Sequence, residues 1–549
     1  MKLTDKLTKI FICLIVIVAA VLRLWNLSNV PPSLDWDEAS WGYNAYSILE
    51  TGRDEYGSLL PVVIRSFNDY KPALYAYLDL PFVALLGLNN LAVRLPDAIF
   101  GILTVLTTYF LVKEMFGRRD LGLLSAFLLA ISPWSIQFSR FTHEGIIGLE
   151  FNLLMVLFFL KGLKHHKFLS LSALCAGLSL YSYQNEKLFV PLLALVLVGI
   201  YVKDLLQIPK KQLMMAFLVG LIISLPMVIF TFTNPGAFMR AKGASFLNNP
   251  VGVLNTQFYP ARELADRRNH DYVGLVLDNR RIAYAKDVWG NYLSHFNPNT
   301  LFITGDEVGR HQPPGMGHLY LVELPFLLLG LFMLLNGKYD RRIKALVILW
   351  ILIVPVPAAF TWDVPNAGRT INFLPTFQIL IALGLIFSYS KSLEWKKYIR
   401  ILVYVIFGVV VLFSFLYYLD QYFVQYRYFN SQDFQYGYDQ IISTVSRNYP
   451  KYRKIEVSNQ IPLDQSYIFF LYDLKYPPSF YQKVSTSGTY KTNHSFDKYE
   501  FRDINKLEMD KDVLYVSGAD VYLDLPGKKI IKTINFLNGT PAYVIYTGK

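Results

Sequence analysis

The sequence predicts a membrane all-α bundle of about 11 transmembrane helices, with extracytoplasmic loops and a C-terminal soluble α/β domain. Three observations predict this fold class. The 549-residue chain is 53% hydrophobic, and its mean hydropathy is +0.31, which is more apolar than an ordinary soluble protein. Apolar stretches close to the length of a membrane-spanning helix recur along it. Lys and Arg gather in alternate short connections between these stretches.

The predicted spans lie at about residues 9–25, 95–113, 121–137, 145–161, 168–182, 187–202, 212–232, 318–336, 344–361, 370–389 and 400–418. The first stretch ends within "VLRLWNLSNVPPS", which offers no small-residue cleavage site. We therefore expect an uncleaved anchor rather than a signal peptide.

The distribution of basic residues predicts the orientation. One set of alternating short connections holds most of the Lys and Arg, whereas the other set contains only Arg140, Lys187 and Arg369. The amino terminus is therefore expected in the cytoplasm, and an odd number of spans places the carboxyl terminus outside a multi-pass cell-membrane protein. The same basic turns account for much of the net charge of +12, so no nucleic-acid partner is predicted.

Two domains are expected: a polytopic transmembrane catalytic domain over 1–418, with outer loops at about 27–94 and 233–317, and an extracytoplasmic α/β domain over 419–549. In the second domain, "KIEVSNQ" and "VLYVSG" have strand character, and "YDQIISTVSRNY" has helical spacing. Cys13 and Cys175 both fall in apolar spans, which indicates neither a disulfide framework nor a cysteine metal site.

Mixed polar side chains collect at the predicted outer ends of the spans, among them His143, Glu144, Tyr183, Lys187, Arg310, His311 and Arg369. This favours chemistry at one face of the membrane. A transporter or flippase of a lipid-linked or sugar substrate is the alternative, but it should place polar groups near the midplane in repeated halves. A third hypothesis is a membrane-anchored binding or sensor protein whose acidic residues only cap helices.

The stretch "DWDEASWGYNAYSILETG" predicts a helix that lies on the membrane surface and ends at Gly52. Capping can use one of the acids before it, and we assign that role to Asp35. The helix dipole favours an ionised carboxylate at this end. Asp37 is therefore the candidate general base, with Glu38 beside it for contacts to the acceptor or substrate.

Basic residues could hold a phosphate near this helix. Lys71 follows Asp69 and Tyr70 and either extends along the membrane edge or binds phosphate together with Arg140, Arg310 and Arg369. A carboxylate base beside a basic phosphate clamp indicates group transfer from a lipid phosphate. "DWD" matches an Asp-x-Asp metal pattern only weakly. No metal site is assigned and no cofactor is required, although a divalent metal is possible.

Four stretches occur in a distinctive order: "DWDEASWGYNAYSILETG", "YKPALYAYL", "VRLPDAIFGILTVLTTYFLVKEMFG" and "ISPWSIQFSRFTHEG". This order resembles the polytopic glycosyltransferases of the C superfamily, in the branch of the protein O-mannosyltransferases and the lipid A aminoarabinose transferase. The resemblance implies inverting transfer of a mannose-like sugar from a polyprenyl-phosphate donor to a hydroxyl of a protein, lipid or glycan acceptor.

The resemblance also implies roles for single residues. Asp37 and Glu38 become the catalytic acidic pair, and Lys71 and Arg140 lie near the donor phosphate. The sequence has "YKP" where the aminoarabinose branch resembles "EKP", and it has Glu144 where an Asp is often expected. Substrate contacts are expected from Asp69, Tyr70, His143, Glu144, Tyr183, Lys187 and His311.

Overall fold

The computed structural model describes the chain except for residues 1–3, 68, 235–236, 238–242, 244, 249–257, 486–492, 505–508 and 520–526. The chain forms two compact units, which are described separately. Unit 1 contains residues 1–22, 100–138 and 143–418, and unit 2 contains residues 23–99, 139–142 and 419–549. One edge between the units falls after residue 418, and unit 2 also includes the whole of the first predicted outer loop, residues 27–94.

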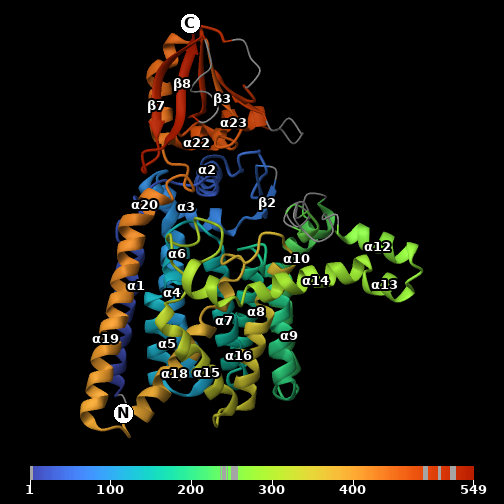
Figure 1. Cartoon of the computed structure of the whole chain (residues 1–549), viewed down its shortest axis with the longest axis vertical. Coiled ribbons are helices and arrows are strands. Elements are labelled where there is room, and N and C mark those ends of the chain that lie inside the picture. Colours follow the sequence, from blue (N-terminus) through green and yellow to red (C-terminus); the bar gives the residue numbers. More distant parts are fainter. Residues whose placement is uncertain are drawn as a thin grey trace. The chain divides into compact units, whose positions relative to one another are not determined.

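The membrane bundle is formed by long apolar helices that run side by side within unit 1 (Figure 1). Within the described residues, eight helical segments are long and apolar enough to cross a membrane. They are α1 (Asp5–Leu24), α4 (Asn90–Phe116), α7 (Gly145–Lys164), α9 (Glu186–Leu205), α10 (Lys210–Thr233), α16 (Arg341–Ile353) with α17 (Pro355–Ala359), η5 (Ile371–Phe373) with α18 (Thr376–Ser392), and α19 (Lys397–Asp420) with η6 (Gln421–Gln425) and α20 (Tyr426–Phe429).

Three other predicted spans form helices that are shorter. They are α5 (Arg119–Ile131), α8 (Phe168–Ser179) and α15 (Leu324–Asn336). Pro133 begins a separate helix, α6 (Pro133–Phe138), because proline removes a backbone donor and interrupts α5. The short turn η4 (Leu321–Glu323) precedes α15. The all-α membrane bundle is therefore confirmed, whereas the number of 11 spans is not.

The short helix α15 packs closely on α18 through two glycines. A Cβ atom at Gly330 would collide with the carbonyl of Leu380, and one at Gly384 would collide with the carbonyl of Phe326. Small residues allow helix backbones to approach closely inside a membrane, where the hydrophobic effect does not drive helices together. The pair of glycines thus lets a helix of 13 residues pack tightly on its longer neighbour.

Unit 1 also contains three helices outside the bundle, α12 (Phe258–Arg268), α13 (Tyr272–Leu277) and α14 (Arg280–Ser294). The turns η2 (Phe246–Asn248) and η3 (Thr300–Thr304) flank them.

Unit 2 combines the first loop with the C-terminal segment. The loop supplies α2 (Trp36–Thr51), the antiparallel hairpin of β1 (Val63–Ser66) and β2 (Asp69–Pro72), and α3 (Leu74–Leu86). The C-terminal segment supplies the strands β3 (Lys454–Ser458), β4 (His494–Phe496), β5 (Tyr499–Arg502), β6 (Val513–Gly518), β7 (Lys528–Asn535) and β8 (Pro541–Gly548). Its helical elements are α21 (Tyr438–Asn448), η7 (Tyr449–Lys451), α22 (Ser466–Asp473) and α23 (Pro478–Ser485).

The C-terminal strands form a six-stranded mixed sheet in the order β4-β5-β3-β6-β8-β7 (Figure 1). β3 is parallel to β5 and β6, and the other pairs are antiparallel. The predicted α/β character of this segment is thus confirmed.

The apolar core of unit 2 is shared between the loop and the C-terminal segment. Tyr43 and Val93 belong to the same buried cluster as Phe470 and Tyr438. Helix α2 packs on α3, α22 and α23, and Trp41 is fully buried. The expectation that α2 lies on the membrane surface is therefore wrong, because the C-terminal helices cover its apolar stripe.

Candidate active site

The start of α2 places three carboxylates in one turn. Asp35 is the N-cap: its Oδ1 accepts from the Glu38 backbone N–H at 2.8 Å, and Glu38 Oε2 accepts from the Asp35 N–H at 3.0 Å. This reciprocal capping box satisfies two backbone donors that a helix end leaves open. Gly52 ends α2 with φ of 70°, as predicted. The assignment of Asp35 as the cap is confirmed.

Glu38 is fully buried and forms an ion pair with Arg94, which is also fully buried. Arg94 donates from Nε at 2.8 Å and from Nη2 at 3.0 Å, and the backbone N–H of Thr142 donates to Glu38 at 3.1 Å. This environment favours a positioning role for Glu38 over direct contact with substrate.

Arg94 also holds the chain before α2. Its guanidinium donates to the carbonyls of Leu27 at 3.1 Å, Pro31 at 2.9 Å and Ser33 at 2.5 Å. Sequence reasoning gave this arginine no role, although it lies in "VRLPDAIFGILTVLTTYFLVKEMFG", one of the four stretches that carry the resemblance. The pair therefore fixes both the entry into α2 and the position of its first turn.

Asp37 is the exposed member of the group. Its side chain is 30% exposed and forms an ion pair with Lys71 Nζ, whose side chain is only 5% exposed. Lys71 extends from β2 over the rings of Trp41 and Phe67, at 5.5 and 5.6 Å. Asp37 therefore lies in the first turn of α2 with a cation beside it. Asp37 is thus a partly exposed carboxylate held by a buried ammonium group.

The neighbouring Asp69 and Tyr70 are half-buried on β2, and Asp69 Oδ1 accepts from the Tyr70 N–H at 2.7 Å. They therefore lie in the same hairpin strand as Lys71.

Arg140 is fully buried in unit 2 and binds backbone carbonyls. It donates to those of Arg23 at 2.9 Å, Trp25 at 2.7 Å and Val30 at 3.0 Å, and to the Tyr422 hydroxyl at 3.2 Å. Arg140 was expected to bind the phosphate of the sugar donor. Its N–H groups instead point at backbone carbonyls of the segment before α2. This geometry favours a structural role for Arg140, whereas Lys71 is the cation that pairs with Asp37.

A second polar group lies in unit 1, around Asp306. Its carboxylate pairs with His311 Nδ1 at 2.7 Å and accepts from the backbone N–H groups of Ala367 and Val308 at 2.7 and 2.9 Å. Burial alone would raise the pKa of Asp306, but His311, His318 and the Ala367 N–H lower it to about 2. Sequence reasoning named His311 and missed Asp306, although the acid lies five residues before it.

Aromatic rings connect His311 with other predicted residues of unit 1. The Phe138 ring lies 5.0 Å from His311 and 4.8 Å from His143, and His143 lies 4.9 Å from the ring of Tyr183. Three of the predicted substrate contacts, His143, Tyr183 and His311, are therefore brought together here.

The remaining predicted residues of unit 1 have varied environments. Arg369 donates to Thr361 Oγ1 at 2.7 Å and to the Asp363 carbonyl at 2.6 Å. Arg310 and Lys187 are half-buried, and Glu144 is a buried residue at the start of α7. Arg369 therefore stabilises its own loop. The phosphate clamp of Lys71, Arg140, Arg310 and Arg369 stays a prediction.

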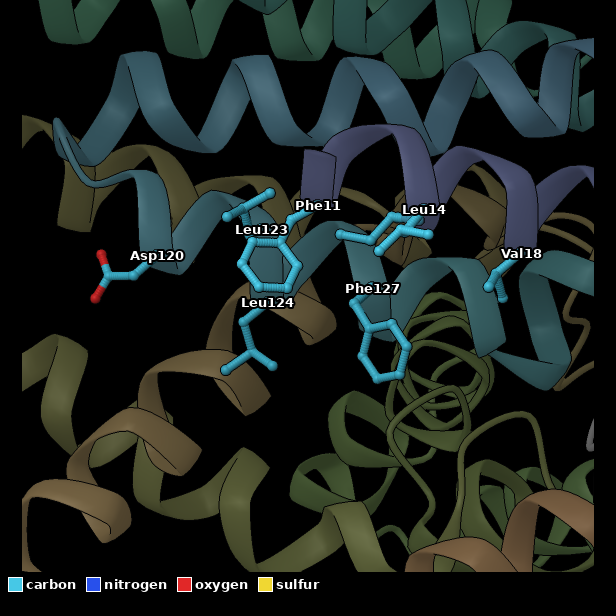
Figure 2. A pocket seen from close by; sticks show the side chains of 8 residues that line it. Phe11, Leu14, Val18, Asp120, Leu123, Leu124 and Phe127 are labelled. Carbon is cyan, nitrogen blue, oxygen red and sulfur yellow. The ribbon is translucent and has the colours of Figure 1, made fainter. Parts of the chain in front are cut away.

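Among the described residues, no group of three or more His, Cys, Asp and Glu side chains is arranged to hold a metal ion. A cavity of about 450 Å³ lies between α1 and α5, within unit 1 (Figure 2). Its lining includes Phe11, Leu14, Leu123 and Phe127, and it contains none of the predicted site residues. Its one acid, Asp120, pairs with Arg118.

Residues 70–230 match the family model described as dolichyl-phosphate-mannose-protein mannosyltransferase. The predicted resemblance is confirmed. The fold is similar to that of ArnT from Cupriavidus metallidurans in the apo state, at a TM-score of 0.58 and 13% identity over 98% of each chain. No curated protein sequence matches the chain.

Two further structures share the fold. ArnT from the same organism bound to undecaprenyl phosphate matches at a TM-score of 0.56 and 13% identity over 97% of each chain. The oligosaccharyltransferase AglB from Archaeoglobus fulgidus, in complex with an inhibitory peptide and a dolichol-phosphate, matches at 0.52 and 13% identity, over 85% of this chain and 63% of that one. At 13% identity, these matches show a shared fold.

Proposed function

We propose that this protein is an inverting glycosyltransferase that moves a mannose-like sugar from a polyprenyl-phosphate carrier to an acceptor hydroxyl. The observation that carries the proposal is the Asp37–Lys71 pair at the start of α2, where a partly exposed carboxylate adjoins a buried cation. The resemblance and the matched folds support the donor class, because similar proteins are described with undecaprenyl phosphate and dolichol-phosphate.

In the proposed reaction, Asp37 accepts the proton of the acceptor hydroxyl as that oxygen attacks the anomeric carbon. The bond between the anomeric carbon and the phosphate oxygen breaks, and its electron pair leaves with the polyprenyl phosphate. The product has the opposite anomeric configuration. Lys71 orients the Asp37 carboxylate and places positive charge near the leaving phosphate. Phosphate is a good leaving group, so the scheme requires no general acid.

We place this reaction on the extracytoplasmic side of the cell membrane, with the amino terminus in the cytoplasm. The basic connections between spans support this orientation. The acceptor is a hydroxyl of a protein, a lipid or a glycan.

The direct test uses the purified full-length protein, polyprenyl-phosphate mannose with a labelled sugar, and membrane extract as a source of acceptors. We expect Asp37→Asn to lower the rate of label transfer by about 10²-fold or more, because general-base catalysis contributes 10²–10⁴. Glu50→Gln is the matched control, an exposed acid at the other end of α2. An unchanged rate in Asp37→Asn would remove Asp37 from catalysis. If the wild type consumed no lipid-linked sugar, the proposed function itself would fail.

A further inference from the structure

The helices α12, α13 and α14 form an arm that projects from the bundle of unit 1 (Figure 1). In that view, α12 and α14 run across the direction of α7, α9 and α16, which belong to the same unit. The proposed reaction uses no residue of this arm. Its direction is that of a helix lying in the plane of a membrane rather than crossing it.

The base of the arm is fixed at the end of a membrane span. Asn291 Nδ2 donates to the carbonyls of Ala359 at 3.2 Å and Thr361 at 2.9 Å, and the Tyr292 hydroxyl donates to the Leu352 carbonyl at 2.8 Å. The apolar segment Arg341–Ala359 ends at this point. Because a span ends where hydrocarbon meets the headgroups, the arm leaves the bundle at the level of the membrane interface.

The tip of the arm exposes apolar side chains. On α13, Tyr272 is 74% exposed, Val273 68%, Val276 64% and Leu277 59%. Nearer the base of the arm, on α14, the Trp289 side chain is also 62% exposed. Contiguous exposed apolar groups indicate a contact surface. Trp and Tyr are enriched at the headgroup level of membranes, where the ring has both apolar and polar neighbours.

Pairs of arginines flank the apolar tip. Arg267 and Arg268 end α12, and Arg280 and Arg281 begin α14. All four residues are exposed. Arginine beside an apolar helix is the composition that binds anionic headgroups while the apolar side chains enter the interface. The partner that fits both features is a lipid surface.

We propose that this arm is a membrane-docking element that inserts α13 into the lipid interface and contacts lipid phosphates through the Arg267–Arg268 and Arg280–Arg281 pairs. Docking buries Val273, Val276 and Leu277 and removes them from water. The proposal does not depend on the sugar-transfer reaction or on which leaflet the arm faces.

The test measures where the tip lies in full-length protein reconstituted into lipid vesicles. Cys13 and Cys175 are first replaced by Ser, because both are free thiols. A Val276→Cys variant then carries an environment-sensitive fluorophore, and Asn269→Cys, at an exposed polar site of the arm, is the matched control. We expect acyl-chain-brominated lipid to quench the label at 276 at least twofold more than the label at 269, with iodide showing the reverse order.

Each other outcome overturns the proposal. Equal iodide quenching at both sites would place the tip in water. A label at 276 that is shielded from both quenchers would place it against protein, either a second copy or another partner.

The contribution of charge to docking is tested by changing Arg267, Arg268, Arg280 and Arg281 to Gln. Lipid quenching at 276 should then fall in anionic vesicles and stay unchanged in neutral ones, and an equal change in both would refute the role of the arginines.

Discussion

Three carboxylates at the start of α2 occupy three different environments. Asp35 caps the helix, Glu38 neutralises a buried arginine, and only Asp37 has a partly exposed side chain beside a cation. A cap is a local interaction, so the sequence was sufficient to assign Asp35. The partner of Glu38 lies 56 residues away, and no local pattern predicts that pairing. For the same reason, the sequence could not show that Arg140 binds backbone carbonyls.

Glu38→Gln should strongly destabilise the protein. The substitution leaves the charge of Arg94 buried without its counter-ion, and breaking one side of a buried ion pair costs about 3–5 kcal/mol. Thermal unfolding in detergent is the measurement, with Glu114→Gln as the control. Glu114 pairs with Lys164 at 2.6 Å, but the lysine is 69% exposed, so this change should have little effect. Equal stability of the two variants would contradict the assigned role.

His318 should make stability depend on pH. Both ring nitrogens are buried without a hydrogen-bond partner among the described residues, and burial is the main cause that lowers its pKa to about 4. An unfolded histidine binds a proton near pH 6.5, whereas the folded one does so only near pH 4. Stability should therefore fall as the pH decreases from about 6.5 to about 4, by roughly 3 kcal/mol in total.

The variant His318→Phe keeps a ring against Trp134 and removes the titrating group. Its melting temperature should decrease less than that of the wild type across this pH range, and the exposed His165→Gln serves as the control. Parallel pH profiles of the melting temperature for the wild type and His318→Phe would show that His318 does not cause the pH dependence of stability.

At the scale of elements, the hydropathy pattern located the helices better than it located their ends. Every predicted apolar stretch contains a helix, but α5 stops at Ile131 because a proline follows, and α8 has only 12 residues. Burial of α2 was also missed, since its apolar stripe fits a lipid interface and a protein core equally well. The covering helices α22 and α23 come more than 400 residues later in the chain.

The contact between α23 and the end of α2 yields a prediction for the element scale. Gln482 Nε2 donates to Thr51 Oγ1 at 2.9 Å, to Ser47 Oγ at 3.1 Å and to the Asp54 carbonyl at 3.0 Å. Gln482→Ala removes all three bonds, so amide hydrogen exchange should become faster in the segment from Thr51 to Asp54.

Amide hydrogen exchange in the bundle helices should remain unchanged, because none of their residues takes part in the Gln482 hydrogen bonds. Lys483→Ala, on the next residue of α23, is the matched control. If exchange near Asp54 were equally slow in Gln482→Ala, the contact with α23 would not stabilise the loop.

At the scale of the whole molecule, we predict the orientation in the membrane from charge rather than from packing. Basic residues crowd one set of connections between spans, and the positive-inside rule places that set in the cytoplasm. Two exposed positions test this in a chain without Cys13 and Cys175: Lys338→Cys in a basic connection and Asn538→Cys in the C-terminal sheet region. In sealed right-side-out membrane vesicles, a membrane-impermeant maleimide should label position 538 at once and position 338 only after the membrane is opened.

The reverse labelling order would place the C-terminal segment in the cytoplasm. Asp37 would then move to the same side, because residues 23–99 and 419–549 share one apolar core. Sugar transfer would consequently require a donor in the cytoplasmic leaflet. One labelling experiment therefore decides both where the C-terminal domain lies and which leaflet must supply the lipid-linked sugar.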